Sequence, residues 1–260
     1  MQTVSHNNRS TAYEVFDRGG DGIPVLLVHG SGGARGVWKS QARLADDRPI
    51  VAMDLSGHGD SDDVDASPGY ETLSAYTDDV VAVADATDAG ILCGNSLGGA
   101  VVLHTLLNRS HRRDFDGAVY AGTGAKLAVL EDLRNWLAED FERAVSWLHE
   151  PGRLFDDADD QVVDLSRTTM LDCGRETVER DFLTSHTFDV RDRLDEITVP
   201  GRAIVGENDA LTPPHYHDYL AAEIGDCDVA IVEDAAHLAM LERPRAFNAA
   251  LHEFCERVEN

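Results

Sequence analysis

Residues 90–107 join a short apolar run to a longer one through a turn that is rich in glycine. The segment reads GILCGNSLGGAVVLHTLL, which is typical of a buried strand followed by a helix. Further strand-like runs fall in residues 11–20, 23–33, 48–62, 116–124, 200–214 and 227–237. Apolar residues recur at the spacing of a helix in residues 37–45, 72–90, 97–110, 215–225 and 244–258. This alternation predicts an α/β fold whose mostly parallel central sheet carries helices on both faces.

One long segment interrupts the alternation. Residues 125–196 contain no strand-like run and are helical and charged, with LEDLRNWLAEDFERAVSWLHEP as their clearest helical stretch. We therefore expect residues 1–124 and 197–260 to form the α/β core, with residues 125–196 as a helical cap insertion between two late strands. A chain of 260 residues that is 43% hydrophobic is long enough to bury one such core.

Charge is the most unusual feature of the composition. The chain has 48 acidic and 22 basic residues, and its formal net charge is -26. Lys39 and Lys126 are the only lysines. Such a charge repels itself, and molar salt would screen most of that repulsion. The composition resembles that of halophilic proteins from haloarchaea, with an ordinary acidic protein as the alternative. Nucleic acid is not an expected partner, because binding phosphates requires a basic surface.

The sequence gives no sign of a membrane span or of disulfide bonds. No run of about 18 apolar residues occurs, and the start, MQTVSHNNRSTAYEV, lacks an apolar signal region, so we expect a cytoplasmic protein. The four cysteines are scattered without a CxxC pair, which predicts neither disulfides nor a cysteine-based metal site. They are Cys93, Cys173, Cys227 and Cys255.

Ser96 allows two interpretations. It could cap the helix that follows, or it could be a nucleophile held at the tip of a sharp bend. The segment Gly94-Asn95-Ser96-Leu97-Gly98 fits the pattern G-x-S-x-G, and it has the strand before it and the helix after it that this pattern requires. We therefore favour the nucleophile.

A serine nucleophile needs a base, and the base needs an acid that orients it. His237 lies just after the last strand-like run, which makes it the expected base among eleven histidines. Asp209 directly follows another apolar strand and is the expected acid. Asp234 is the alternative acid, although we expect it in a turn or at a strand end. The order Ser, Asp, His agrees with a triad at the carboxyl ends of strands.

An oxyanion hole would complete such a site with two backbone N–H donors. One is expected from Leu97, directly after the nucleophile. The other is expected from the segment VHGSGG, with the Ser31 amide slightly favoured over that of Gly32. His29 is expected to fix this loop by hydrogen bonding rather than to take part in catalysis.

Together these motifs resemble the α/β-hydrolase superfamily. They are LLVHGSGG, MDLSGHGDSD, CGNSLGGA, VGENDALTP and AAHLAMLERP, and the resemblance extends over the whole chain except for the insertion. The resemblance implies a triad of Ser96, Asp209 and His237 under a helical cap. His58 is given no catalytic role, although it could line the entrance. A serine nucleophile, in place of the aspartate found in relatives that cleave epoxides or carbon–halogen bonds, indicates acyl chemistry.

No metal or organic cofactor is expected, and His215 and His217 are interpreted as bystanders. The first functional hypothesis is a carboxylic-ester hydrolase with a small-molecule acyl substrate. Carbon–carbon bond hydrolases and enol-lactone hydrolases are alternatives on the same triad, and the tryptophan common after the histidine of the former is absent here. A non-catalytic receptor for a small ligand is an alternative of another class. The sequence does not specify the oligomeric state or the substrate, and it leaves open which cap residues line the pocket. Trp136, Phe141, Trp147 and Leu148 are available there, although packing between cap and core is their expected role.

Overall fold

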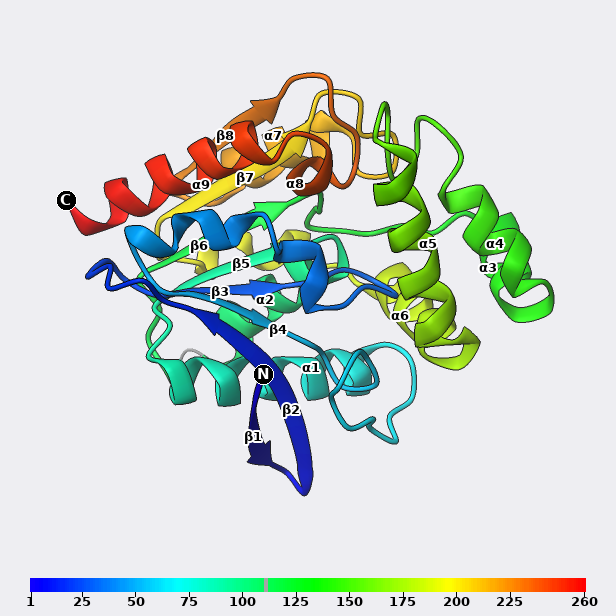
Figure 1. Ribbon diagram of the computed structural model, residues 1–260, viewed down its shortest axis with the longest axis horizontal. Helices are drawn as coiled ribbons and strands as arrows, with labels where there is room; N and C mark the ends of the chain where they lie inside the picture. Colours follow the sequence, from blue (N-terminus) through cyan, green and yellow to red (C-terminus); the bar gives the residue numbers. More distant parts are fainter. Residues whose placement is uncertain (110–111) are drawn as a thin grey trace.

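The computed structural model describes residues 1–109 and 112–260, and these contain one eight-stranded sheet (Figure 1). The strand order is β1-β2-β4-β3-β5-β6-β7-β8. The pairs β1–β2 and β2–β4 are antiparallel and all the others are parallel. The strands are β1 (Gln2–His6), β2 (Arg9–Phe16), β3 (Val25–Val28), β4 (Ile50–Met53), β5 (Ile91–Asn95), β6 (Gly117–Ala121), β7 (Gly201–Gly206) and β8 (Cys227–Val232). The predicted α/β fold is confirmed.

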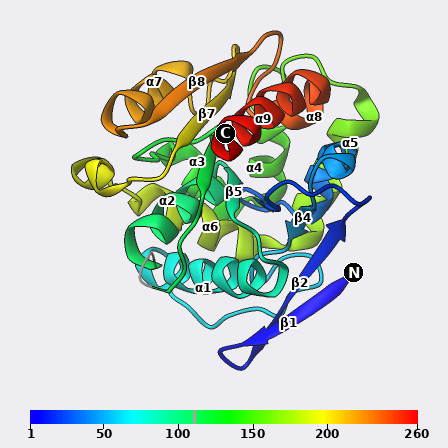
Figure 2. The ribbon, with the colours of Figure 1, turned by 90° about the vertical axis from the view of Figure 1, so that its left-hand side faces the viewer.

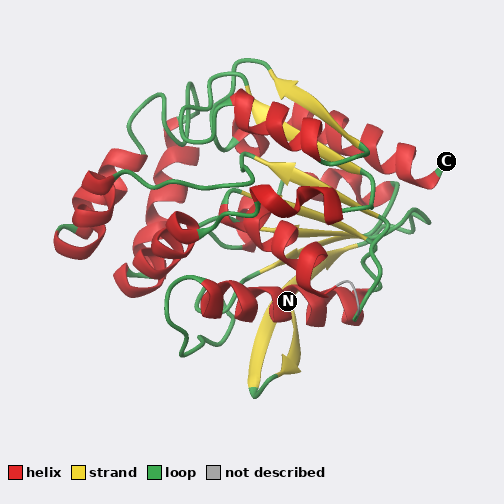
Figure 3. Cartoon of the chain, turned by 180° about the vertical axis from the view of Figure 1, so that it is seen from behind, coloured by secondary structure: helices red, strands yellow, loops and turns green. Residues whose placement is uncertain are grey.

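Helices cover both faces of this sheet (Figures 2 and 3). The α-helices are α1 (Tyr70–Thr87), α2 (Leu97–Arg109), α3 (Glu131–Glu139), α4 (Phe141–Leu148), α5 (Asp160–Cys173), α6 (Arg175–Thr187), α7 (Pro214–Glu223), α8 (Ala239–Glu242) and α9 (Pro244–Glu259). Three 3₁₀ helices join them: η1 (Arg35–Trp38), η2 (Gln41–Asp46) and η3 (Arg191–Glu196).

The central strands are buried on both faces, as their continuous apolar runs predict. In β3, Leu26 and Val28 belong to the apolar cluster with α1, α2 and α7. Val25 and Leu27 belong to the cluster with α9 and the 3₁₀ helices η1 and η2. Successive side chains of a strand point to opposite faces, so one short apolar strand contributes to both cores.

Two local predictions differ from the structure. Residues 2–6 form β1, an edge strand whose mixed polar sequence carries no buried-strand signal. The expected helix over residues 37–45 is instead two 3₁₀ helices, η1 and η2, separated at Lys39 and Ser40. Ser110, the last residue of the helix expected over 97–110, lies outside the described residues.

The chain between β6 and β7 forms a helical layer beyond the carboxyl ends of the parallel strands. It contains α3, α4, α5 and α6, followed by η3. In Figure 1 the arrowheads of β3 and β7 point towards this layer. Across the described residues, no helix is both long and apolar enough to cross a membrane.

The topology concentrates functional loops at one place. The chain passes from β3 to β4 on one side of β3, and then to β5 on its other side. In an open α/β sheet, such a change of direction leaves a crevice at the carboxyl ends of the two strands. The loop after β3 and the turn after β5, which carries Ser96, both open into it.

Candidate active site

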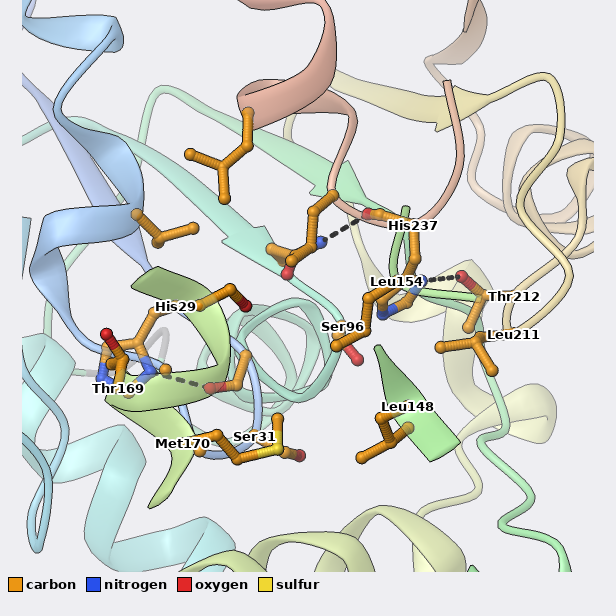
Figure 4. Close-up of a pocket in the computed structure, with 18 of the residues that line it drawn as sticks. His29, Ser31, Ser96, Leu148, Leu154, Thr169, Met170, Leu211, Thr212 and His237 are labelled. Atoms are coloured by element: carbon orange, nitrogen blue, oxygen red, sulfur yellow. Dashed lines mark hydrogen bonds between the residues drawn. The ribbon is translucent and has the colours of Figure 1, made fainter. Parts of the chain in front are cut away.

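Ser96 occupies the turn between β5 and α2 in a backbone conformation that side chains rarely adopt. Its φ is 54°, in the left-handed region. The Ser96 amide donates to the Ala121 carbonyl at 2.9 Å, and its carbonyl accepts from Thr123 Oγ1 at 2.8 Å. Such strain persists only where surrounding contacts enforce it. The turn therefore holds the Ser96 side chain in one place at the wall of the cavity (Figure 4).

Two neighbouring glycines make this turn possible. A Cβ on Gly94 would overlap the Gly98 carbonyl, and a Cβ on Gly98 would overlap the Val28 carbonyl. Strand β5, helix α2 and strand β3 thus approach more closely than any side chain would allow. This explains why the motif around Ser96 requires glycine at these positions.

His237 and Asp209 come together from the loops after β8 and β7. Nδ1 of His237 lies 2.9 Å from Oδ2 of Asp209, and both side chains are buried. An ionised carboxylate only accepts hydrogen bonds, so the proton sits on Nδ1 and leaves Nε2 as the acceptor. His237 and Ser96 line the same cavity (Figure 4).

The Asp209 carboxylate is held by an extensive set of donors. Oδ1 accepts from the amides of Leu211 and Thr212 at 2.9 and 2.8 Å. Oδ2 accepts from the Thr212 hydroxyl at 2.8 Å in addition to His237. Burial alone would raise the pKa of Asp209, but the charge of His237 and these hydrogen bonds hold that pKa below its ordinary value. Asp209 is therefore ionised near neutral pH.

Asp234, the alternative acid, lies elsewhere. It is exposed in a turn, with a φ of 53°, and its amide contacts Glu207. The described residues show no hydrogen bond from Asp234 to His237. Of the two aspartates, it is Asp209 whose carboxylate contacts His237.

The two oxyanion donors considered in the loop after β3 differ in availability. The Gly32 amide donates to the buried Asp181 carboxylate of α6 at 3.0 Å, so it is not free for a substrate. Within the described residues, the amides of Ser31 and Leu97 have no hydrogen-bond acceptor. In this structure the Gly32 amide is thus occupied by Asp181, whereas the amides of Ser31 and Leu97 are available to a ligand.

The remaining histidines near the site are structural. His29 accepts the Leu55 amide on Nε2 and donates from Nδ1 to the Gly30 carbonyl, which fixes the loop as expected. Burial and the nearby His58 lower the pKa of His29 to about 4. His58 is not at the entrance, contrary to expectation: it is buried and lies 2.9 Å from Asp181.

His217 accepts the Thr123 amide at 3.0 Å and, with a pKa lowered by burial to about 4, is neutral. Thr123 in turn holds the Ser96 carbonyl. In the part of the chain that the structure describes, no group of three or more His, Cys, Asp or Glu could hold a metal ion.

A cavity of about 1120 Å³ lies between the loops and the helical layer. Apolar side chains of residues 125–196 supply much of its lining, including Leu133, Trp147, Leu148, Leu154, Met170 and Phe182. Of the four side chains singled out from the sequence, Trp147 and Leu148 line the cavity. Trp136 packs against Trp147 instead, and Phe141 is partly buried and packs against the apolar core. Sequence reasoning missed the roles of Thr212, Thr123 and Asp181. The pattern Asp-x-x-Thr could have indicated Thr212, whereas nothing marks Asp181 in its charged helix.

Comparisons with known proteins identify the family of the chain. The profile of the Alpha/beta hydrolase family matches residues 25–250. The chain is 30% identical over 248 residues to a pimeloyl-[acyl-carrier protein] methyl ester esterase of Neisseria meningitidis, covering 90% of this chain and 94% of that protein. It is 25% identical to 3-oxoadipate enol-lactonase 1 of Acinetobacter baylyi, covering 97% and 96%. A solved thermophilic esterase superposes with a TM-score of 0.85 at 26% identity, covering 99% and 97%. The chain therefore belongs to the α/β-hydrolase family and is a hydrolase.

Proposed function

We propose that the protein is a serine hydrolase that cleaves small or medium carboxylic esters through an acyl-enzyme on Ser96. The observation that carries this proposal is the buried Asp209–His237 pair, which lines the same cavity as a serine in a strained turn. The similarity to a methyl ester esterase and to a solved esterase supports ester bonds as the target.

Each residue has a role in the proposed mechanism. His237 Nε2 removes the proton of Ser96 as its oxygen attacks the ester carbonyl, and the amides of Leu97 and Ser31 bind the oxyanion. His237 then protonates the departing alcohol, which leaves an acyl group on Ser96. Water attacks this acyl group with His237 again as base, releasing the acid. Asp209 keeps the proton on Nδ1 of His237 and stabilises the imidazolium in both steps.

The cavity lining supports an apolar acyl group. Of 48 acidic residues in the chain, none is among the described residues that line the cavity. Lys39 is the only lysine or arginine among them. A substrate carboxylate buried among these apolar side chains would find no cationic partner beside it, which would make its burial costly. An alkyl chain would instead be stabilised by apolar contact with the leucines of the helical layer.

An enol-lactone is the second candidate substrate, because one relative is named for that activity and an enol-lactone is also an ester. Carbon–carbon cleavage has less support, since Leu238 stands where that subfamily commonly has tryptophan. A non-catalytic receptor would retain the same fold and bind a ligand in the cavity without turnover.

We also propose that residues 125–196 act as a cap that selects the substrate over a core of residues 1–124 and 197–260. Finally, the net charge of -26 and the scarcity of lysine support a halophilic protein of the cytoplasm of a salt-accumulating organism, such as a haloarchaeon.

The experiment that tests the proposed function is hydrolysis of p-nitrophenyl esters of increasing chain length in molar salt, for the wild type beside Ser96→Ala. Turnover that falls by several orders of magnitude in Ser96→Ala would support it, because triad members act as a unit. An enol-lactone and a dienone tested in parallel separate the alternative reactions. A folded wild type that turns over none of them would favour the receptor.

A further inference from the structure

We propose that Asp181, a residue of the helical layer, is a positioning residue that holds the oxyanion loop after β3 in its working conformation. This inference rests on the proposed function and deepens it. It means that the helical layer does more than enclose the substrate: it fixes one of the two donors on which the chemistry depends.

The first observation is the placement of one buried carboxylate among three donors. Oδ2 of Asp181 accepts the Gly32 amide at 3.0 Å and lies 2.9 Å from Nε2 of His58. Oδ1 accepts the Tyr76 hydroxyl at 2.7 Å. Asp181 and Tyr76 are fully buried, and only 1% of the surface of His58 is exposed. A carboxylate in such a place is rigid, because each oxygen has a fixed partner.

The second observation is that the loop packs directly against two helices of the layer. Gly32 has a φ of 63°, and a Cβ built there would lie 2.9 Å from Met170 of α5 and 3.1 Å from Val178 of α6. The chain therefore approaches α5 and α6 with no room for a side chain. Gly32 is therefore held twice by the helical layer, once by packing and once by the hydrogen bond to Asp181.

The consequence for chemistry follows from the planarity of the peptide bond. The Gly32 amide shares a plane with the Ser31 carbonyl, so anchoring it to Asp181 restricts the rotation about the Cα–C bond of Ser31. The Ser31 amide, one residue back, is the proposed oxyanion donor. Without the anchor this donor would sample other directions, and an oxyanion hole works only when its donors are preorganised.

The third observation concerns charge. An isolated carboxylate next to an oxyanion would oppose the reaction, but Nε2 of His58, a residue that does not line the cavity, lies 2.9 Å from Oδ2 of Asp181. Burial alone lowers the pKa of His58, yet the Asp181 charge outweighs this and raises it well above 6.5. Asp181 can therefore hold the loop as part of a neutral ion pair.

The test compares Asp181→Leu, which removes the acceptor, with Asp181→Asn, which keeps one oxygen for the Gly32 amide. The matched control is Asp189→Asn, because Asp189 follows α6, pairs with Lys126 and Arg191 at the surface, and does not line the cavity. kcat and KM for a p-nitrophenyl ester are measured in molar salt on folded protein. We expect kcat to fall about 100-fold in Asp181→Leu and about 10-fold or less in Asp181→Asn. KM should stay within about 3-fold and Asp189→Asn should match the wild type.

A folded Asp181→Leu variant with wild-type kcat would overturn the inference and leave the proposed function standing. So would a loss of kcat/KM to which a rise in KM contributes as much as the fall in kcat. A wild type with no Ser96-dependent turnover would overturn the proposed function instead. If Asp181→Leu does not fold, amide hydrogen exchange of Gly32 decides. Strong protection in the wild type that weakens in Asp181→Asn is expected, and rapid exchange in the wild type would contradict the anchor.

Discussion

Nδ1 of His237 lies 2.9 Å from Oδ2 of Asp209, although the two residues are 28 positions apart in the chain, with helix α7 between them. Strands β7 and β8 are parallel neighbours, so the loops after them begin side by side at one edge of the sheet. The sheet therefore brings the acid to the base, and the donors from Leu211 and Thr212 fix the acid in turn.

Replacing Asp209 by Asn should remove the charge while keeping the shape of the side chain. We expect kcat to fall by about 10⁴-fold, because an amide in this position favours the wrong tautomer of the histidine. Asp234→Asn is the matched control and should retain kcat within about 2-fold, since Asp234 is exposed in a turn. Steady-state kinetics on a chromogenic ester measure both variants. Equal losses in the two would show that the acid has been assigned wrongly.

Thr212 should contribute to catalysis through Asp209. Its hydroxyl donates to Oδ2 at 2.8 Å, and this hydrogen bond lowers the pKa of Asp209. Thr212→Val keeps the volume but loses the donor to a charged group, so kcat should fall about 10-fold. Thr212→Ser restores the hydroxyl and should recover most of the activity. A Thr212→Val enzyme as active as the wild type would show that the two backbone donors suffice.

The Asp181–His58 pair should make the stability of the fold depend on pH in both the acidic and the alkaline range. The pKa of His58 is raised by Asp181, so the contribution of His58 to the free energy of unfolding is complete below pH 6.5. This contribution is lost as the pH rises through the raised pKa. Burial opposes ionisation of Asp181, but His58, Tyr76 and the Gly32 amide lower its pKa, so its contribution is complete above 3.8 and is lost as the pH falls through the lowered value.

The measurement is the free energy of unfolding of the wild type and of Asp181→Asn as a function of pH, from below 3.8 to above 6.5. The variant should be less stable by about 3 kcal/mol between these limits, because it breaks a buried pair. The difference should shrink above and below them. A difference that does not vary with pH would contradict the assignment of charge to this pair.

Salt should stabilise the protein. At about 0.1 M salt the Debye length is about 10 Å and charges repel across the surface, whereas at about 1 M it is about 3 Å. The midpoint of thermal unfolding and the esterase rate should therefore both rise between these concentrations of KCl. Full stability at low salt, with activity lost at molar salt, would refute the halophilic interpretation.

Much of the fold could be predicted because the central strands are continuous apolar runs, and helices of amphipathic spacing separate them. Strand β1 could not, since its side chains are largely exposed and its stability comes from pairing with β2. The segment around η1 and η2 also escaped prediction, because tertiary packing of Trp38 and Leu44 overrides its local helical spacing.

The proposed triad could be read from motifs because Ser96, Asp209 and His237 each follow an apolar strand. Asp181 could not, because it is one acidic residue among many in a charged helix. Its role depends on the distance between that helix and the loop after β3, which only the tertiary structure gives. For the same reason the sequence does not distinguish the Ser31 amide from that of Gly32, whereas in the structure the Gly32 amide donates to Asp181.

The role of Ser96 as nucleophile is tested by treating the folded protein with a fluorophosphonate and measuring its intact mass and the modified peptide. An activated serine displaces fluoride and forms a stable phosphonyl ester, whereas ordinary serines do not react. We expect one adduct, on the peptide that contains Ser96, and none in Ser96→Ala. An adduct of equal amount in Ser96→Ala, or none in a folded wild type, would contradict it.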